Sequence, residues 1–459
     1  MSKAIDMTKG SPFKNIFRFA LPIGLGFALQ NLYGLGDSLI VSLSRGADAT
    51  TGVNLTGSIS FLTLGFAQGI TAGFGIVLSQ YVGAKNVQKM KNSIGTSIVL
   101  TVIIALIVSA ITTVLARPML VMLETDEQFL EYSVSYIRAI FIGLVFNSLY
   151  NYTDQVMRAL GDSKTPFKIL ILCAVLNIGL NSLLFVFDGL SVAWAGWATV
   201  ISQAISALVG FIVIFKKFPE VRPKKEDFKL KLKFCLHHLG MGLPMAIQFI
   251  ITASGCMVQQ WAFNSLDNEL YAMAQGAANK IDNIFGLFLN GAGVAMATYV
   301  GQNYGAREYD RIKKGVKVSF GVGAIFTVIS MTCMLTLAVP MSRLLLPADT
   351  IVGDAETVYN LVFTYAIFQS SFYYALFMIF QMRQCVQAIG RSMVAMFGGV
   401  VEFAMRVFIA FTFAKWFGFV GACLSNPLAW VGGATYLTIA FIVCYKKMIK
   451  NQNKETLLA

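Results

Sequence analysis

The stretch IVLTVIIALIVSAITTVLA, residues 98–116, contains no charged residue. Two further uncharged stretches run from Ile169 to Phe187 and from Ser191 to Phe215. About 20 apolar residues in a helix span the ~30 Å hydrocarbon core of a bilayer. Backbone amides in lipid must form their hydrogen bonds within their own segment. We therefore predict that these stretches are transmembrane helices.

The composition agrees with a membrane-embedded chain. Hydrophobic residues make up 56% of the sequence and charged residues 13%, whereas about 25% charge is usual in soluble domains. Too little charge is present to coat the surfaces of several soluble domains. The fold class predicted is all-α integral membrane, with the lipid bilayer as the main partner.

Several function classes lack support in the sequence. The seven cysteines are scattered singly, and no phosphate-binding loop, zinc-binding histidine pair or nucleophile elbow occurs. We therefore expect no enzyme and no cofactor. The net charge of +13 is explained by a basic membrane face, so no nucleic-acid partner is expected. The two histidines, His237 and His238, are expected at the surface.

Apolar periodicity and turn signals predict twelve transmembrane helices. We place them at roughly 15–44, 52–80, 93–116, 131–158, 166–187, 191–215, 236–263, 270–299, 315–340, 355–383, 393–414 and 418–445.

The distribution of Lys and Arg predicts the topology. With twelve spans, both termini and every second loop share one side. Most of the 36 basic residues, among them Arg383, fall on that side. The opposite side holds Arg45, Arg117, Arg343 and Lys415, and three more lie within helices. The positive-inside rule makes the basic side cytoplasmic. We expect a multi-pass protein of the cell (inner) membrane with both termini in the cytoplasm.

Two halves of the sequence resemble each other. Leu21-Pro22 recurs as Leu243-Pro244, and Gln80 to Lys85 recurs as Gln302 to Arg307, each 222 positions later. Ala159 to Ser163 recurs as Ala388 to Ser392, 229 positions later. Six helices per half give two pseudo-symmetric bundles, which is a transporter design.

The predicted division has three parts. An amino-terminal lobe covers 1–215, a basic cytoplasmic linker covers 216–235, and a carboxy-terminal lobe covers 236–459. The linker is read either as a simple membrane-surface connection or as a site for anionic lipid.

One ionisable residue, Asp37, lies in an otherwise apolar helix, where a carboxylate is costly and marks a functional site. Counting from the helix ends places Asp37, Asn177, Asn181 and Thr199 in one layer roughly 9–15 Å below the outer surface. A carboxylate, two amide oxygens and a hydroxyl suit Na⁺, or a proton on Asp37. Polar contacts between helices are the alternative reading of the three uncharged residues.

Other polar residues within the helices are candidates for a cavity lining or a second site. They are Asn147, Asn151, Asp154, Gln248, Asp282 and Glu402. Asp154 also lies four residues before Arg158, and Glu402 four before Arg406, so ion pairs are the alternative reading for these two acids.

The sequence resembles the multidrug and toxic compound extrusion (MATE) family over nearly its whole length, closer to the DinF-like branch. The residues that carry the resemblance are Leu21 to Ile23, Leu32 to Asp37, Gln80 to Ala84, Arg158 to Pro166, Ala198 to Gln203 and Gly301 to Ala306. The resemblance implies two six-helix lobes around a central cavity and cation-coupled drug export.

The resemblance also implies that Asp37, Asn177, Asn181 and Thr199 match the amino-lobe cation site of the family. Members with that site usually carry Asp at the position of Asn181, so one formal charge is lost here. The NorM-like branch has a glutamate early in helix seven, where this chain has Gln248, so that branch's second cation site is not supported.

We therefore expect an antiporter that exports small cationic or amphipathic compounds in exchange for H⁺ or Na⁺ by alternating access, as a monomer. A flippase for a lipid-linked precursor is the alternative.

Overall fold

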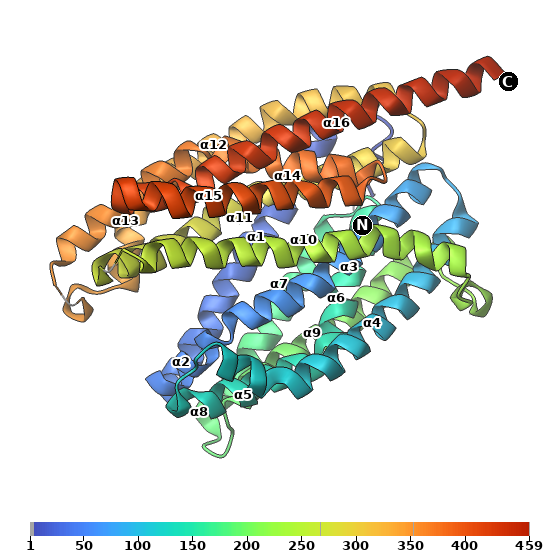
Figure 1. The fold of residues 1–459 in the computed structure, drawn as a ribbon. Helices are drawn as coiled ribbons and strands as arrows, with labels where there is room; N and C mark the ends of the chain where they lie inside the picture. Colours follow the sequence, from blue (N-terminus) through green and yellow to red (C-terminus); the bar gives the residue numbers. More distant parts are fainter. Residues whose placement is uncertain (1–3, 267, 352, 459) are drawn as a thin grey trace. The chain divides into compact units, whose positions relative to one another are not determined.

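The computed structural model describes residues 4–266, 268–351 and 353–458, and they form helices with no strand (Figure 1). The helices are α1 (Pro12–Arg45), α2 (Ala47–Leu55), α3 (Gly57–Gly83), α4 (Val87–Met122), α5 (Glu127–Ile142), α6 (Leu144–Ala159), α7 (Lys164–Asn181), α8 (Leu183–Val186), α9 (Ala193–Lys217), η1 (Pro219–Val221), η2 (Lys225–Phe228), α10 (Leu232–Asn264), α11 (Glu269–Gly305), α12 (Tyr309–Leu345), η3 (Ala348–Thr350), α13 (Ala355–Ser371), α14 (Tyr373–Ala388), α15 (Ser392–Cys423) and α16 (Ser425–Leu458). The all-α prediction is confirmed.

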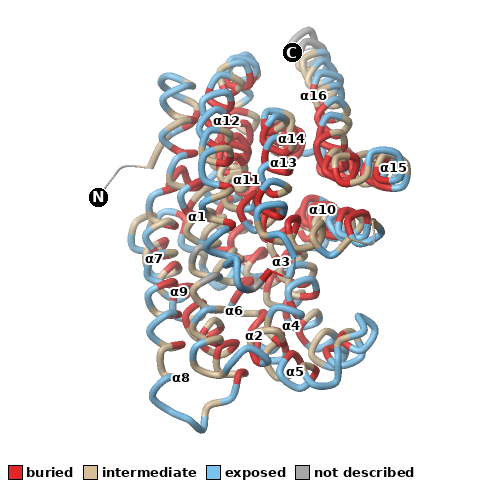
Figure 2. Tube along the Cα trace, turned by 90° about the vertical axis from the view of Figure 1, so that its left-hand side faces the viewer, coloured by how far each residue is buried: buried red, intermediate tan, exposed pale blue. Residues whose placement is uncertain are grey.

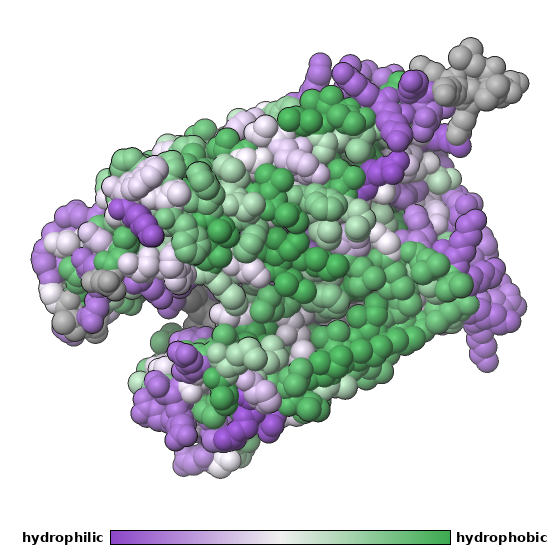
Figure 3. Space-filling view, in the orientation of Figure 1, coloured by the Kyte–Doolittle hydropathy of each residue, from purple (hydrophilic) through white to green (hydrophobic). Residues whose placement is uncertain are grey.

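Most of these helices can cross a bilayer. Among the described residues, nine spans are long and apolar enough, and up to eleven are found when each of two bent helix pairs counts as one span. The 34-residue α1 contains the first predicted span. The surface over α4 is apolar between hydrophilic ends (Figure 3), where Leu106, Ile111 and Val114 are exposed. Such a surface faces lipid.

Two predicted spans are bent. The span predicted at 131–158 is α5 and α6, which meet at 52°, and that at 355–383 is α13 and α14, which meet at 46°. The first bend lies at Gly143, where an added Cβ would lie 2.1 Å from a methyl of Val200 on α9. The second lies at Phe372, 229 positions later. The bend is thus part of the repeat.

The chain forms two compact units that do not follow the order of the sequence. The first unit contains Met1–Asp6 and Leu29–Ile250, and the second contains Met7–Ala28 and Ile251–Ala459. The predicted lobes keep each of these helices with its own half of the sequence. In the structure, the first half of α1 belongs to the second unit and the first half of α10 belongs to the first unit. The breaks after Ala28 and Ile250 are 222 positions apart, which is the spacing of the sequence repeat.

Small residues on these helices explain this arrangement. In the first unit, an added Cβ at Gly73 of α3 would lie 2.4 Å from the Cα of Gly242, and one at Gly69 would lie 2.6 Å from that of Ala246. In the second unit, a Cβ at Gly291 of α11 would lie 2.5 Å from the backbone of Gly24. Such backbone contact is the usual way in which helices associate in lipid. Within each unit, buried residues lie where helices face their neighbours (Figure 2).

The predicted linker is packed against α4 and is not a free connection. An added Cβ at Gly95 would lie 2.3 Å from the carbonyl oxygen of Asp227 in η2. Just beyond it, the Nε2 atom of His238 lies 2.8 Å from the Ser93 hydroxyl and its Nδ1 atom 2.8 Å from the Phe234 carbonyl oxygen. His238 is fully buried. The surface placement predicted for His238 is wrong, because α10 approaches α4 and supplies partners for both ring nitrogens.

We predict that Gly73→Ala lowers the thermal stability of the protein, because its methyl group must push α3 and α10 apart. Overpacking of this kind costs about 1–3 kcal/mol. Thermal unfolding in detergent measures the change. Gly321→Ala is the matched control, because an added Cβ there meets nothing within 4 Å. Equal melting temperatures for the two variants would contradict the importance of this contact.

Candidate functional site

The predicted cluster around Asp37 is assembled within the first unit from three helices. Asp37 comes from the second half of α1, Asn177 and Asn181 from the last two turns of α7, and Thr199 from the second turn of α9. Asn177 and Asn181 are fully buried, and Asp37 and Thr199 are half-buried. The structure therefore brings together all four residues that depth counting placed in one layer.

A chain of hydrogen bonds connects the four side chains. Asn181 Nδ2 donates to Asp37 Oδ1 at 2.7 Å and, more weakly, to Asn177 Oδ1 at 3.4 Å. Asn177 Nδ2 donates to Thr199 Oγ1 at 3.0 Å. Thr199 Oγ1 in turn donates to the carbonyl oxygen of Ala195 at 3.1 Å. The carboxylate of Asp37 is thus an acceptor at one end of an ordered polar chain.

One acceptor in this chain is unused. The Oδ1 atom of Asn181 is buried and has no hydrogen-bond partner. A buried acceptor without a partner costs about 1–3 kcal/mol. A proton on Asp37, with the Asn181 amide turned over, or a cation near both oxygens would satisfy it. The residues present therefore fit either a proton or a small hard cation.

Among the described residues, Asp37 has no fixed cation as a partner. Within 4–266, 268–351 and 353–458, no Lys, Arg or His forms an ion pair with its carboxylate. In the same residues, no group of three His, Cys, Asp or Glu side chains could hold a metal ion. The site has one formal charge, as the sequence predicted.

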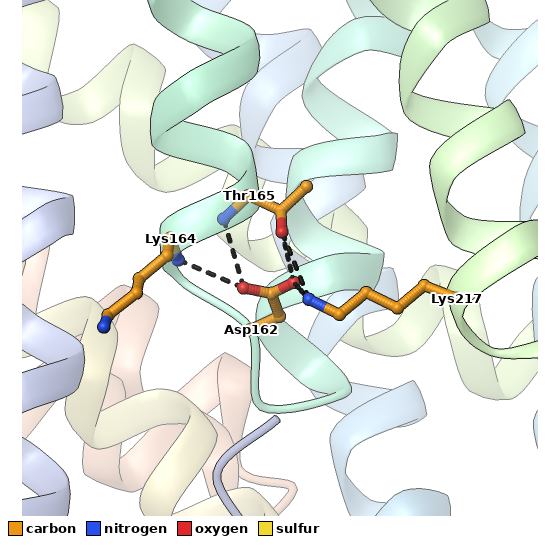
Figure 4. A network of polar contacts seen from close by, with 4 residues as sticks. All are labelled: Asp162, Lys164, Thr165 and Lys217. Carbon is orange, nitrogen blue, oxygen red and sulfur yellow. Dashed lines mark hydrogen bonds and ion pairs between the residues drawn. The ribbon is translucent and has the colours of Figure 1, made fainter. Parts of the chain in front are cut away.

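Asp162 connects α7 and α9, two of the helices that carry the site, at the ends that lie away from Asp37 (Figure 4). Its Oδ1 atom accepts hydrogen bonds from the backbone N–H groups of Lys164 and Thr165 at the start of α7. Its Oδ2 atom lies 2.5 Å from the Nζ atom of Lys217 at the end of α9. Burial acts to raise the pKa of Asp162, but the hydrogen bonds from Lys217 and Thr165 outweigh it and lower the pKa. The ionised carboxylate therefore holds α7 and α9 together.

Two further sets of hydrogen bonds near the site were not predicted from the sequence. Arg45, at the end of α1, donates from Nε to the carbonyl oxygen of Leu190 at 2.9 Å and from Nη2 to that of Phe187 at 2.7 Å. Trp194 of α9 donates to the carbonyl oxygen of Leu180 on α7 at 2.8 Å. Both sets of hydrogen bonds lie near the helix ends opposite Asp162 and fix α1, α7 and α9 around Asp37. Backbone acceptors leave no signal in a sequence.

Three of the polar candidates lie on α6, and they form hydrogen bonds or an ion pair. Asn147 Nδ2 donates to Gln203 Oε1 of α9 at 3.3 Å, and Asn151 Nδ2 donates to Asn147 Oδ1 at 3.0 Å. Asp154 pairs with Arg158 at 2.7 Å. The ion pair considered for Asp154 is therefore present.

The remaining candidates are divided between the units. Gln248 is buried in the part of α10 that belongs to the first unit. Asp282 and Glu402 are buried in the second unit, where the hydroxyl of Tyr373 donates to Asp282 Oδ1 at 2.7 Å. Four of the six candidates thus belong to the first unit and two to the second.

Glu402 lies between two arginines. Its oxygens are 2.8 Å from Arg383 Nη2 and 2.8 Å from Arg406 Nη2. The pair with Arg406 was considered from the spacing, whereas Arg383 was assigned to the basic cytoplasmic side. The structure places Arg383 inside α14, where it is 7% exposed and its guanidinium is turned towards Glu402, and its side of the membrane stays a prediction.

Repeated halves of long apolar helices, with ionisable residues buried inside the spans, define a multi-pass membrane transporter. The chain matches the family described as MatE over residues 22–183 and 244–412. It belongs to this family of transporters. The two matches begin at Pro22 and Pro244, the residues that open the sequence repeat.

Known proteins agree with this assignment. The chain is 30% identical over 316 residues to the "Probable multidrug resistance protein YpnP" of Bacillus subtilis, covering 68% of this chain and 69% of that protein. It is 23% identical to the "Multidrug export protein MepA" of Staphylococcus aureus, covering 92% and 91%. An outward-facing MATE family multidrug resistance transporter has a TM-score of 0.87 at 18% identity, covering 98% and 99%. The predicted twelve-helix fold is confirmed.

We predict that Glu402→Gln destabilises the protein by about 3–5 kcal/mol, because it leaves two buried guanidinium groups without a counter-charge. Thermal or chemical unfolding in detergent measures the loss. Glu356→Gln is the matched control, because its pair with Arg343 is exposed and exposed pairs contribute about 0–1 kcal/mol. If both variants lose the same stability, the Arg383–Glu402–Arg406 cluster is not a structural ion-pair network.

Proposed function

We propose that this transporter is a secondary antiporter that exports small cationic or amphipathic compounds in exchange for protons taken up by Asp37. The observation that carries the proposal is the chain from Asp37 to Asn181, Asn177 and Thr199, with its single carboxylate and its one unused acceptor. The printed names of the relatives, which describe drug resistance and drug export, support the substrate class.

The amide of Asn181 suits both protonation states of Asp37. The ionised carboxylate accepts a hydrogen bond from Asn181 Nδ2, as observed at 2.7 Å. The carboxylic acid becomes a donor, and a turned amide then offers Asn181 Oδ1 as acceptor. The amide oxygen and nitrogen exchange places without a change in shape. The hydrogen bond between Asp37 and Asn181 is therefore kept in both states, while the turned amide gives up the weaker bond from Asn181 Nδ2 to Asn177 Oδ1.

Alternation between the two states couples the two fluxes. A cationic substrate is attracted to the site when Asp37 is ionised, and a protonated Asp37 no longer attracts it. If the site opens to one side of the membrane at a time, the proton gradient drives release outside. The proposed cycle moves charge and substrate without covalent chemistry.

Sodium is the second candidate for the coupling ion. The oxygens of Asp37, Asn177, Asn181 and Thr199 would hold Na⁺, which in this role supplies the exchangeable charge. The unused Oδ1 atom of Asn181 favours this reading. Against it, hard cations prefer several oxygen ligands with more negative charge than one carboxylate. We further propose a location in the cell membrane with both termini in the cytoplasm, supported by the distribution of Lys and Arg, and a monomeric state.

We predict that Asp37→Asn abolishes gradient-driven efflux while the protein still folds and inserts into the membrane. The amide keeps the size of the side chain and an acceptor for Asn181, but it cannot exchange a proton. Efflux from proteoliposomes under separately imposed proton and Na⁺ gradients measures the loss. Asp48→Asn, at an exposed position of α2, is the control and should transport normally. Wild-type efflux from Asp37→Asn vesicles would place the coupling site elsewhere.

We predict that Asn181→Asp increases the dependence of efflux on Na⁺, because a second carboxylate strengthens an oxygen-rich cation site. The Na⁺ concentration for half-maximal efflux should fall on the order of tenfold. Efflux is measured at fixed pH over a range of Na⁺ concentrations. An unchanged ion preference in a variant that still transports would mean that Asn181 is not a ligand.

A further inference from the structure

The segment from Arg222 to Lys233, here called the basic segment, carries six basic and two acidic residues. It contains η2 and enters the first turn of α10, and it lies wholly in the first unit. Asp227, one of the two acidic residues, is buried. The charge that the segment presents outward is therefore strongly positive.

The basic segment is held in a fixed place. Asp227 Oδ1 accepts a hydrogen bond from Gln88 Nε2 of α4 at 2.7 Å, and its Oδ2 atom accepts one from the backbone N–H of Lys224 at 2.7 Å. Gly95 of α4 lets the backbone of Asp227 approach closely. Both oxygens of Asp227 are thus used in hydrogen bonds that hold the segment in place, and the segment keeps a net positive charge of six basic against two acidic residues.

Exposed basic and apolar residues alternate along the end of the segment. Phe228, Leu230 and Leu232 are 37%, 46% and 75% exposed. Lys229, Lys231 and Lys233, which lie between and after them, are exposed as well. Lys229 has an extended backbone, and α10 begins at Leu232. Apolar and basic side chains are therefore exposed next to one another along this stretch.

The neighbouring surface continues this pattern. Phe234 stacks on Tyr81 at the end of α3, with ring centroids 5.9 Å apart. The ammonium group of Lys89 lies 5.8 Å from the centroid of the Tyr81 ring. Aromatic rings beside lysines at the end of an apolar span are typical of the membrane–water interface.

We propose that the basic segment is a binding site for the phosphate groups of anionic phospholipids in the leaflet at which α10 begins. Leucines exposed at the end of a membrane span belong among acyl chains, and the long lysine side chains reach from there to the headgroup phosphates. Basic residues at a membrane surface attract anionic lipid additively. A soluble anion would use the lysines and leave the exposed leucines without a partner.

Native mass spectrometry of the full chain in detergent, titrated with phosphatidylglycerol, tests the proposal. The dissociation constant of the bound lipid should rise about fivefold for each lysine removed in the triple variant Lys229→Gln, Lys231→Gln, Lys233→Gln. Gln88→Ala, which releases Asp227 and keeps every lysine, should weaken binding to a smaller extent. Lys231→Gln alone, with about a fivefold effect, replaces the triple variant if that variant does not fold.

The control variant changes Lys446, Lys447 and Lys450 of α16 to Gln and removes the same charge from exposed positions of the second unit. It should bind phosphatidylglycerol as the wild type does. The proposal is overturned if this control weakens binding as much as the triple variant, if phosphatidylcholine binds equally well, or if inorganic phosphate displaces the lipid. The measurement needs no transport, so its result is independent of the antiport proposal.

Discussion

The backbone contact between small residues of α3 and α10, and its counterpart between α1 and α11, is the constraint on which the rest of this structure depends. Helices in lipid gain little from burying apolar side chains against each other, so their association relies on close packing. Gly73 and Gly242 in the first unit, and Gly24 and Gly291 in the second, permit that approach. As a result, α1 and α10 each contribute residues to both units. Asp37 therefore lies on a continuous helix whose first half belongs to the unit that does not contain the site.

Glu402 in the second unit and Asp37 in the first have partners of different kinds. Glu402 is fixed by two guanidinium groups at 2.8 Å, and its charge cannot change without leaving both arginines uncompensated. Asp37 has amide partners, which tolerate either protonation state. A coupling residue must change its charge in every cycle, whereas a structural ion pair must not. This difference favours Asp37 over Glu402 as the coupling group, although both are acids within apolar helices.

Much of the fold could be predicted because its signals are local. Uncharged runs give the spans, and depth counted from their ends was sufficient to group Asp37 with Asn177, Asn181 and Thr199. The sequence did not reveal features that depend on distant partners. The bend at Gly143 depends on Val200, the burial of His238 depends on Ser93, and the buried position of Arg383 depends on Glu402. The assignment of the first halves of α1 and α10 to their units also depends on which helices approach each other. The predicted positions of the spans do not contain that information.

The repeat copies the backbone but not the chemistry. At the offset of 222, the position equivalent to Asp37 is Gln259, which is buried and accepts a hydrogen bond from Asn426 at 2.7 Å. At the offset of 229, the position equivalent to Asn177 is Arg406. The second half therefore has a neutral amide in place of the carboxylate and a tethered positive charge in place of the amide. The positive charge of Arg406 belongs to the chain itself, so it cannot cross the membrane as a coupling ion does. At these equivalent positions the first half thus carries a carboxylate with an amide partner and the second half a permanent positive charge, which supports Asp37 as the proposed coupling residue.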